Sequence, residues 1–207
     1  MQWTGTLTSV FLAVLGFVGG HLLLSWPPLR RPLVRALGEG AFAALYSIVS
    51  VAFLVWLVAA YRVAPPLLVY DFGRWANLVP IVLMPFASML VVLGLASKNP
   101  TAVGGDKFLE NGLRPVGIFT VTRHPFLCGV ALWALAHLIA NGDAASIMLF
   151  GGMALLSVLG MAGIDHKRAL RLGEAWQVYA AQTSRLPFAA AAGAGARIDW
   201  SGIGWLR

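Results

Sequence analysis

The chain has 207 residues, of which 59% are hydrophobic and only 11% are charged. A soluble domain carries about 25% charged residues, and no soluble core of this size could bury so much apolar surface, so the composition excludes a soluble protein and predicts one embedded in a lipid bilayer. The net charge of +7 does not indicate nucleic-acid binding, because the basic residues form no stripe with interleaved aromatic side chains.

Five stretches of the sequence contain no Asp, Glu, Lys or Arg and predict membrane spans. They cover residues 1–29, 41–61, 75–97, 125–142 and 144–164. A span needs about 17–25 mostly apolar residues, so each is long enough, the fourth only barely. We therefore expect an all-α integral membrane protein with about five transmembrane helices in a single domain, residues 1–207. The expected spans are residues 4–26, 41–61, 76–97, 124–142 and 144–164.

The segment after the fifth stretch predicts an amphipathic helix that lies on the membrane surface, over residues 165–184. Its apolar side chains can face lipid while its charged side chains face water. The expected lipid-facing residues are Leu170, Trp176, Val178 and Tyr179, and the expected water-facing residues are Lys167, Arg168, Arg171 and Glu174. Pro187 would end this region, and residues 185–207 would form a C-terminal tail.

The distribution of basic residues predicts the orientation in the membrane. The second connection holds only Arg62 and Arg74, and the fourth holds none, whereas the first and third connections and the tail hold the other 13 of the 15. Because basic residues are retained on the cytoplasmic side, we expect the N-terminus outside and the C-terminus in the cytoplasm, as in a bacterial inner membrane.

The histidines are the best clue to function, because a histidine inside a membrane span is costly and usually has a role. His21 follows two glycines in the first span, His124 stands just before Pro125, and His137 lies near the outer end of the fourth span. Imidazoles in such a bundle can bind a metal or haem, or move a proton. Each could also simply bond a backbone carbonyl or lie at the interface. His166, beside Asp165, is expected to be solvated.

Helix geometry limits which histidines can act together. Thirteen helical residues rise about 20 Å, so His124 and His137 cannot hold one iron if their helix is continuous. His21 must pair with one of them, or with neither. Because Trp26 and the two following prolines mark the cytoplasmic end of the first span, depth favours His124 as the neighbour of His21, although helix tilt leaves the choice of pair open.

Arg123 and Cys128 flank the same region of the chain. A buried guanidinium needs a carboxylate partner, and we expect Arg123, His124 and Glu174 to form one cluster on the cytoplasmic side, with Asp165 as the competing partner. The single cysteine excludes an internal disulfide and a zinc site built on a cysteine pair, and predicts a small apolar filler.

Several of these elements together resemble the NnrU family of membrane proteins and its relative, 15-cis-ζ-carotene isomerase. The resemblance rests on Gly20-His21, Pro28-Leu29-Arg30, Leu37-Gly38-Glu39, Thr122 to Pro125 with Gly129, Leu132 to His137, Asn141 to Asp143, Leu172 to Glu174 and Thr183 to Ala189. It runs from about His21 to Ala190. The family name reflects a link to nitrite and nitric oxide metabolism and does not specify a reaction.

The resemblance implies haem b as the cofactor and a hydrophobic, polyene-like substrate. Carried over residue by residue, the two iron ligands match His21 and His137, with Trp133 on the same helix in the cofactor region and His124, beside Arg123, as a third essential residue. One departure matters: the isomerase has a cysteine three residues before the helix histidine, where this chain has Ala134. This puts a redox-dependent ligand switch in doubt.

A fainter resemblance is to membrane methyltransferases of the isoprenylcysteine and phospholipid type, through Gly117 to Gly129 and the later Gly173, Glu174, Tyr179 and Pro187. It implies that Arg123 and His124 line an S-adenosylmethionine pocket and that Glu174 holds the cofactor. That chemistry has no use for His21 or His137, so their presence favours haem. A third possibility is a non-catalytic factor that assists assembly of a denitrification enzyme.

Overall fold

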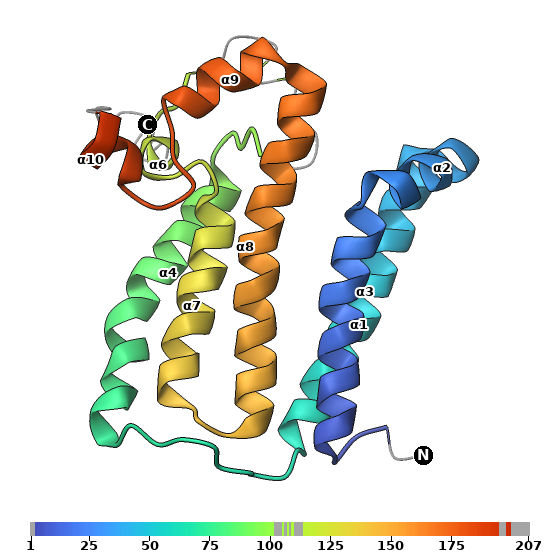
Figure 1. The fold of residues 1–207 in the computed structure, drawn as a ribbon, viewed down its shortest axis with the longest axis vertical. Coiled ribbons are helices and arrows are strands. Elements are labelled where there is room, and N and C mark those ends of the chain that lie inside the picture. The colour runs from blue at the N-terminus through green and yellow to red at the C-terminus, as the bar shows by residue number, and fades with distance from the viewer. Residues whose placement is uncertain are drawn as a thin grey trace. The chain divides into compact units, whose positions relative to one another are not determined.

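The computed structural model describes residues 3–101, 105, 107, 109, 114–194 and 198–199. These residues form helices and no β-strand, apart from an isolated bridge between Leu68 and Asp143, which confirms the all-α prediction. In chain order the elements are α1 (Leu7–Ser25), α2 (Pro27–Leu37), α3 (Glu39–Arg62), η1 (Arg74–Asn77), α4 (Leu78–Ala96), α6 (Ile118–Val121), α7 (Pro125–Ala140), α8 (Ala144–Leu172), α9 (Glu174–Ala181) and α10 (Ala189–Ala194) (Figure 1).

Four helical segments are long and apolar enough to cross a bilayer. They are Leu7–Ser25, Glu39–Arg62, Arg74–Ala96 and Ala144–Leu172. The remaining apolar helix, α7, has 16 residues, which is just below the usual minimum for a span. The chain is therefore a membrane protein, with α7 as the short member that the sequence also made the weakest candidate.

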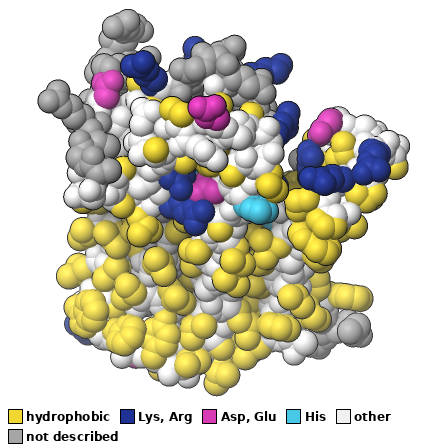
Figure 2. All heavy atoms as spheres, turned by 45° about the horizontal axis from the view of Figure 1, so that its top comes forward, with side chains coloured by type: hydrophobic (Ala, Val, Ile, Leu, Met, Phe, Trp, Pro, Cys, Tyr) yellow, Lys and Arg dark blue, Asp and Glu magenta, His cyan; other side chains and the backbone are white. Residues whose placement is uncertain are grey.

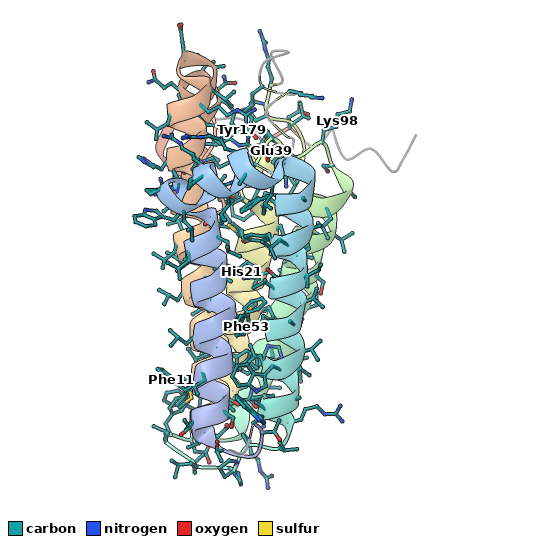
Figure 3. All side chains as sticks on the ribbon, turned by 90° about the vertical axis from the view of Figure 1, so that its right-hand side faces the viewer. Phe11, His21, Glu39, Phe53, Lys98 and Tyr179 are labelled. Atoms are coloured by element: carbon teal, nitrogen blue, oxygen red, sulfur yellow. The ribbon has the colours of Figure 1, made fainter. Side chains whose placement is uncertain are left out.

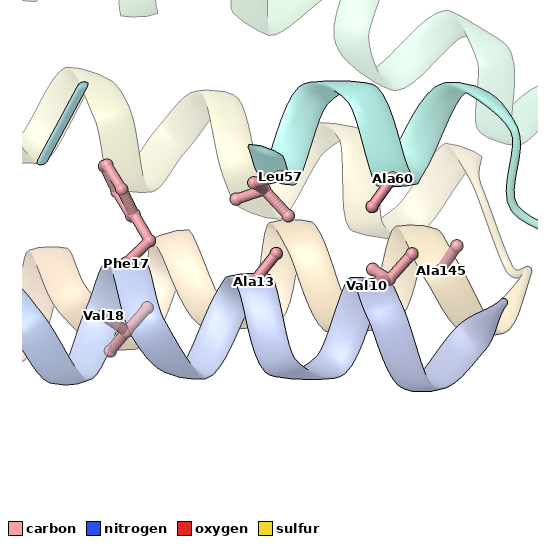
Figure 4. Close-up of a cluster of buried hydrophobic side chains, with 7 residues drawn as sticks. All are labelled: Val10, Ala13, Phe17, Val18, Leu57, Ala60 and Ala145. Atoms are coloured by element: carbon pink, nitrogen blue, oxygen red, sulfur yellow. The ribbon is translucent and has the colours of Figure 1, made fainter. Parts of the chain in front are cut away.

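The chain forms two compact units, one from residues 1–80 and 134–156 and the other from residues 81–133 and 157–207. In the first unit, α1 and α3 run side by side with α2 joining them at one end (Figure 1). Buried side chains of α1 and α3, together with Ala145 of α8, form its core: Val10, Ala13, Phe17, Val18, Leu57, Ala60 and Ala145 (Figure 4). Gly16 lets the Phe53 ring lie directly on the α1 backbone, because a Cβ there would be 2.1 Å from the ring.

Helix α2 lies in a segment that we expected to be a loop. Two prolines occupy its first turn, where their missing N–H groups cost nothing, and Gly38 ends it at a φ of 81°. Arg30 donates a hydrogen bond to Glu39 at 2.8 Å and lies over the Phe42 ring. The helix buries none of its residues within the chain, as expected for a basic helix at a membrane interface.

In the second unit, α4, α7 and α8 approach closely at glycines. A Cβ at Gly129 would lie 2.7 Å from the Ala87 carbonyl oxygen, and one at Gly94 would lie 2.8 Å from the Phe126 nitrogen. Small residues let helix backbones approach in this way in membranes. Their contacts continue into a core of apolar residues that also includes α6: Leu90, Leu93, Ile118, Phe119, Val121, Cys128 and Met161.

The prediction of a surface helix over residues 165–184 is wrong in the helix boundaries and in the direction that some of the side chains face. Helix α8 continues through Asp165 to Leu172, and a separate helix, α9, follows after a break at Gly173, whose φ is 53°. Leu170 and Val178 are exposed as expected, but Trp176 and Tyr179 are buried against Leu109 rather than facing lipid. Within the predicted tail, residues 189–194 form α10, while residues 195–197 and 200–207 lie outside the described residues.

Candidate functional site

Asp165 is the centre of a charged cluster in the second unit. It stands on α8 and is only 4% exposed. Its carboxylate accepts hydrogen bonds from three side chains: Arg123, His124 and Arg185. These bonds explain why α8 does not end here, because a buried carboxylate is tolerated when it is paired and hydrogen-bonded.

Arg123 fixes the segment between α6 and α7 against this carboxylate. Its Nη2 lies 2.7 Å from Asp165 Oδ2, and its Nε lies 3.1 Å from the same oxygen. Its Nη1 donates to the Thr183 carbonyl at 3.0 Å, and its backbone N–H donates to the Ser184 carbonyl at 2.9 Å. The planar guanidinium therefore joins α8 to the chain that follows α9, a role that suits arginine better than lysine.

His124 is buried completely, with a side chain that is 0% exposed. Its Nε2 lies 2.6 Å from Asp165 Oδ1. A carboxylate can only accept, so Nε2 carries the proton and donates it. The other ring nitrogen, Nδ1, is buried and has no hydrogen-bond partner among the described residues.

Arg185 completes the cluster, and two hydrogen bonds to its backbone carbonyl fix its position. Its Nε donates to Asp165 Oδ2, while its carbonyl oxygen accepts hydrogen bonds from the Thr122 hydroxyl at 2.7 Å and the Cys128 thiol at 3.2 Å. Its side chain remains 50% exposed. The cluster therefore reaches the protein surface through Arg185. Figure 2 shows one face of the protein on which basic side chains lie beside an acidic one at the border of the hydrophobic area.

Tyr179, on α9, contributes a second buried polar atom without a partner. The residue is 2% exposed, and its hydroxyl forms no hydrogen bond with the described residues. Burial raises the pKa of Tyr179, and the positive charge of Arg123 opposes that rise. The hydroxyl therefore stays protonated and lies within electrostatic reach of the Arg123 guanidinium.

The expected partner Glu174 is not in this cluster. It begins α9 and is exposed, whereas Asp165 takes the bonds of both Arg123 and His124. The structure therefore shows that Asp165, the competing candidate, is the carboxylate partner of Arg123 and His124. The sequence indicated no role for Arg185, because nothing in local spacing places a residue 20 positions from Asp165 against its carboxylate. His166, the neighbour of Asp165, is exposed.

His21 belongs to the first unit and is half-buried on α1, nearer to the α2 end of that helix than Phe11 (Figure 3). Its Nδ1 lies 2.8 Å from the Phe17 carbonyl oxygen, so it donates there, and its ring lies against Phe17 and Tyr46. This leaves the Nε2 lone pair for a ligand. A metal-ligating histidine usually donates its other N–H to a carbonyl in this way. A Cβ at Gly19 or Gly20 would meet nothing within 4 Å.

His137 and Trp133 stand one turn apart on α7, and both are partly exposed. The His137 ring stacks on Phe150 of α8, with centroids 5.1 Å apart. Helix α7 is continuous from Pro125 to Ala140, so His124 and His137 stand far apart along it, as expected from the sequence.

The structure places His21 and His137 at different levels of the first unit. A Cβ at Gly152 would lie 2.6 Å from Val14 Cγ1, so those two positions are level. His21 lies seven residues beyond Val14 on α1, about 10 Å along the helix, whereas His137 stacks on Phe150, on the other side of Gly152. His21 and His137 therefore lie at different levels of the first unit, and the structure does not bring their imidazoles together.

Within the described residues, no three His, Cys, Asp or Glu side chains come close enough together to hold a metal ion. The family comparison then decides the relationship. The family model for the NnrU protein matches residues 9–206.

The chain belongs to the NnrU family. It is also similar to the chloroplastic 15-cis-zeta-carotene isomerase of Zea mays, with 35% identity over 74 residues, and to that of Arabidopsis thaliana, with 34% identity over 74 residues. Each match covers 36% of this chain and 20% of the plant protein, so the chain spans about a fifth of the length of these relatives. No solved structure gives a significant match.

Proposed function

We propose that this NnrU-family membrane protein binds haem b through His21 and acts as an isomerase-like protein on a hydrophobic, polyene-like substrate. The similarity to two zeta-carotene isomerases supports the reaction class. The observation that carries the proposal is the His21 imidazole, which donates Nδ1–H to the Phe17 carbonyl and so presents Nε2 as a ligand.

Haem, when bound, would supply an electrophilic and redox-active iron for chemistry at a double bond. The chain's own contribution is to hold the His21 ring by the Phe17 carbonyl bond and the Tyr46 edge contact. A substrate soluble in lipid would reach this part of α1 directly from the bilayer, because apolar side chains such as Leu15 and Leu23 are exposed along the helix.

The family resemblance and the depth of the residues in the membrane assign the second iron ligand differently. The family resemblance implies His137, and the depth argument favours His124. In this structure His137 lies at a different level of the first unit from His21, and His124 belongs to the other unit. Single alanine variants of the three histidines decide between them.

The test is the visible spectrum of the protein purified from cells with ample haem. A low-spin ferric haem with two imidazoles gives a sharp Soret band, and His21→Ala should abolish or shift it. If His137→Ala loses the low-spin spectrum and His124→Ala keeps it, the pair is His21 and His137, and the opposite result assigns His21 and His124. A colourless wild-type preparation contradicts haem binding.

His166→Ala is the matched control, because His166 is exposed and its loss should leave the spectrum unchanged. The alternatives make different predictions. A membrane methyltransferase would bind S-adenosylmethionine saturably and lose that binding in His124→Ala. A non-catalytic assembly factor for a denitrification enzyme would tolerate loss of His137 with only an effect on stability.

A further inference from the structure

The cluster around Asp165 contains more positive charge than its carboxylate can balance. Arg123 and Arg185 are both cationic and both bond the single carboxylate of Asp165. With a neutral His124, the group carries one net positive charge in a region where Asp165 and His124 are buried. Half of the Arg185 side chain is exposed, so an anion can reach this excess positive charge from the protein surface and pair with it.

Two buried polar atoms in this region also lack partners. His124 Nδ1 and the Tyr179 hydroxyl are the buried side-chain atoms without a hydrogen bond in the described part of the chain. Their residues are 1% and 2% exposed. A buried polar atom left unpaired costs about 1–3 kcal/mol, and such atoms in a native structure require an explanation, for example a ligand.

The two atoms define the hydrogen bonds that the ligand must make. Because His124 Nε2 donates to Asp165, Nδ1 of the neutral ring is an acceptor and needs a donor from the ligand. The Tyr179 hydroxyl and the Arg185 guanidinium are donors and need a ligand oxygen. An oxyanion that also carries a hydroxyl group satisfies both requirements.

We propose that Arg185, Tyr179 and His124 form a binding site for a phosphate group that carries a neighbouring hydroxyl. Two sources supply this chemistry: free hydrogen phosphate, and a lipid head group such as that of phosphatidylglycerol. Arg185 is the residue that a ligand contacts first, because its side chain is half exposed while its carbonyl is fixed by Thr122 and Cys128. Arg123 is already committed to Asp165 and to Thr183, and it positions the other residues rather than the ligand.

Arg185 and Tyr179 are not among the candidate iron ligands, whereas His124 is the alternative second ligand, so the variants that test this site are made at Arg185 and Tyr179. The experiment uses the full chain in phosphatidylcholine nanodiscs. One arm titrates inorganic phosphate at pH 7 by calorimetry. The other replaces part of the phosphatidylcholine with phosphatidylglycerol and measures the thermal midpoint of unfolding. Saturable phosphate binding indicates the soluble source, and a raised midpoint in phosphatidylglycerol without phosphate binding indicates the lipid source.

Two variants test the residues. Arg185→Gln removes the positive charge, and Tyr179→Phe removes only the hydroxyl and keeps the ring that packs beside Trp176. If the wild type binds phosphate, each variant should raise the Kd for phosphate about tenfold or more. If the wild type responds to phosphatidylglycerol, each variant should reduce the rise in the thermal midpoint. Tyr179→Phe should be neutral or stabilising without ligand, because it removes an unpaired group, and this separates a binding effect from a folding defect.

Arg35→Gln is the matched charge control, since Arg35 is exposed on α2 and lies outside the cluster. It should leave both responses unchanged. The proposal is overturned if the wild type responds to neither phosphate nor phosphatidylglycerol, or if Tyr179→Phe and Arg185→Gln respond as the wild type does. The haem spectrum of the same preparations reports on the proposed function separately.

Discussion

Arg123 and Asp165 are 42 residues apart in the chain and form an ion pair through two nitrogens of one guanidinium. Their side chains are 12% and 5% exposed. The same guanidinium bonds the Thr183 carbonyl, so this pair joins α8, the segment before α7 and the chain after α9. It is therefore a buried polar restraint within the second unit.

Arg123→Glu should destabilise the protein strongly. Breaking a buried pair costs about 3–5 kcal/mol, because it leaves an uncompensated charge, and here it would also place two carboxylates together. The measurement is the denaturant midpoint of the purified protein in detergent. The double variant Arg123→Glu with Asp165→Arg should recover only part of the loss, since Arg185 and His124 also bond Asp165.

The control for this pair lies in the first unit. Arg30 and Glu39 form an ion pair of 2.8 Å with side chains that are 38% and 70% exposed. Exposed pairs contribute about 0–1 kcal/mol, so Arg30→Glu should change the midpoint little. If Arg30→Glu lowered the denaturant midpoint as much as Arg123→Glu, burial would not determine how much stability is lost when an ion pair is broken.

The orientation is tested by cysteine labelling. With the N-terminus outside and five crossings, a cysteine at position 2 should react with a membrane-impermeant reagent in spheroplasts, and one at position 193 only after permeabilisation. The background variant is Cys128→Ser, whose hydroxyl can still donate to the Arg185 carbonyl that the thiol contacts. Labelling of both positions from one side would contradict the odd number of crossings.

Gly129→Ala should separate α4 from α7. A Cβ at Gly129 would lie 2.7 Å from the Ala87 carbonyl oxygen and 3.1 Å from the Val91 nitrogen, and backbone atoms cannot rotate away. Overpacking of this kind costs about 1–3 kcal/mol, measurable as a lower thermal midpoint. Gly151→Ala is the control, because a Cβ there meets nothing within 4 Å. Equal midpoints for the two variants would show that α4 and α7 do not pack through Gly129.

The sequence predicted the spans well because uninterrupted apolar stretches map directly onto transmembrane helices. It ended the last span at Ile164, because the expected spans were the stretches without charged residues and Asp165 is charged. An unpaired carboxylate is costly inside a helix that crosses the membrane. The structure removes that cost with donors from Arg123 and Arg185. Those contacts are formed by distant residues, so charge-free stretches cannot reveal them.

Helix α2 and the buried face of α9 were missed for related reasons. The α2 segment contains three arginines and was treated only as the first connection between spans, yet two of its three prolines lie in its first turn, where proline is compatible with a helix. For α9, the amphipathic pattern identified the apolar residues correctly. It could not tell lipid from protein as the partner of Trp176, which packs with Leu109, 67 positions earlier. Arg123 was likewise expected to pair with a carboxylate, but the choice between Glu174 and Asp165 depended on tertiary contacts.

His124→Ala should destabilise the second unit even in protein prepared without haem. The variant removes the Nε2–H donor from Asp165 and leaves a void, because His124 is among the most completely buried side chains. Loss of a hydrogen bond to a buried charge costs about 1.5–3 kcal/mol, whereas His166→Ala, at the exposed neighbour of Asp165, should stay within about 0.5 kcal/mol. His124→Gln, whose amide can still donate, should lose less than His124→Ala. Equal denaturant midpoints for His124→Ala and the wild type would show that the bond to Asp165 does not stabilise the fold, and would leave any loss of haem in that variant to be explained by ligation alone.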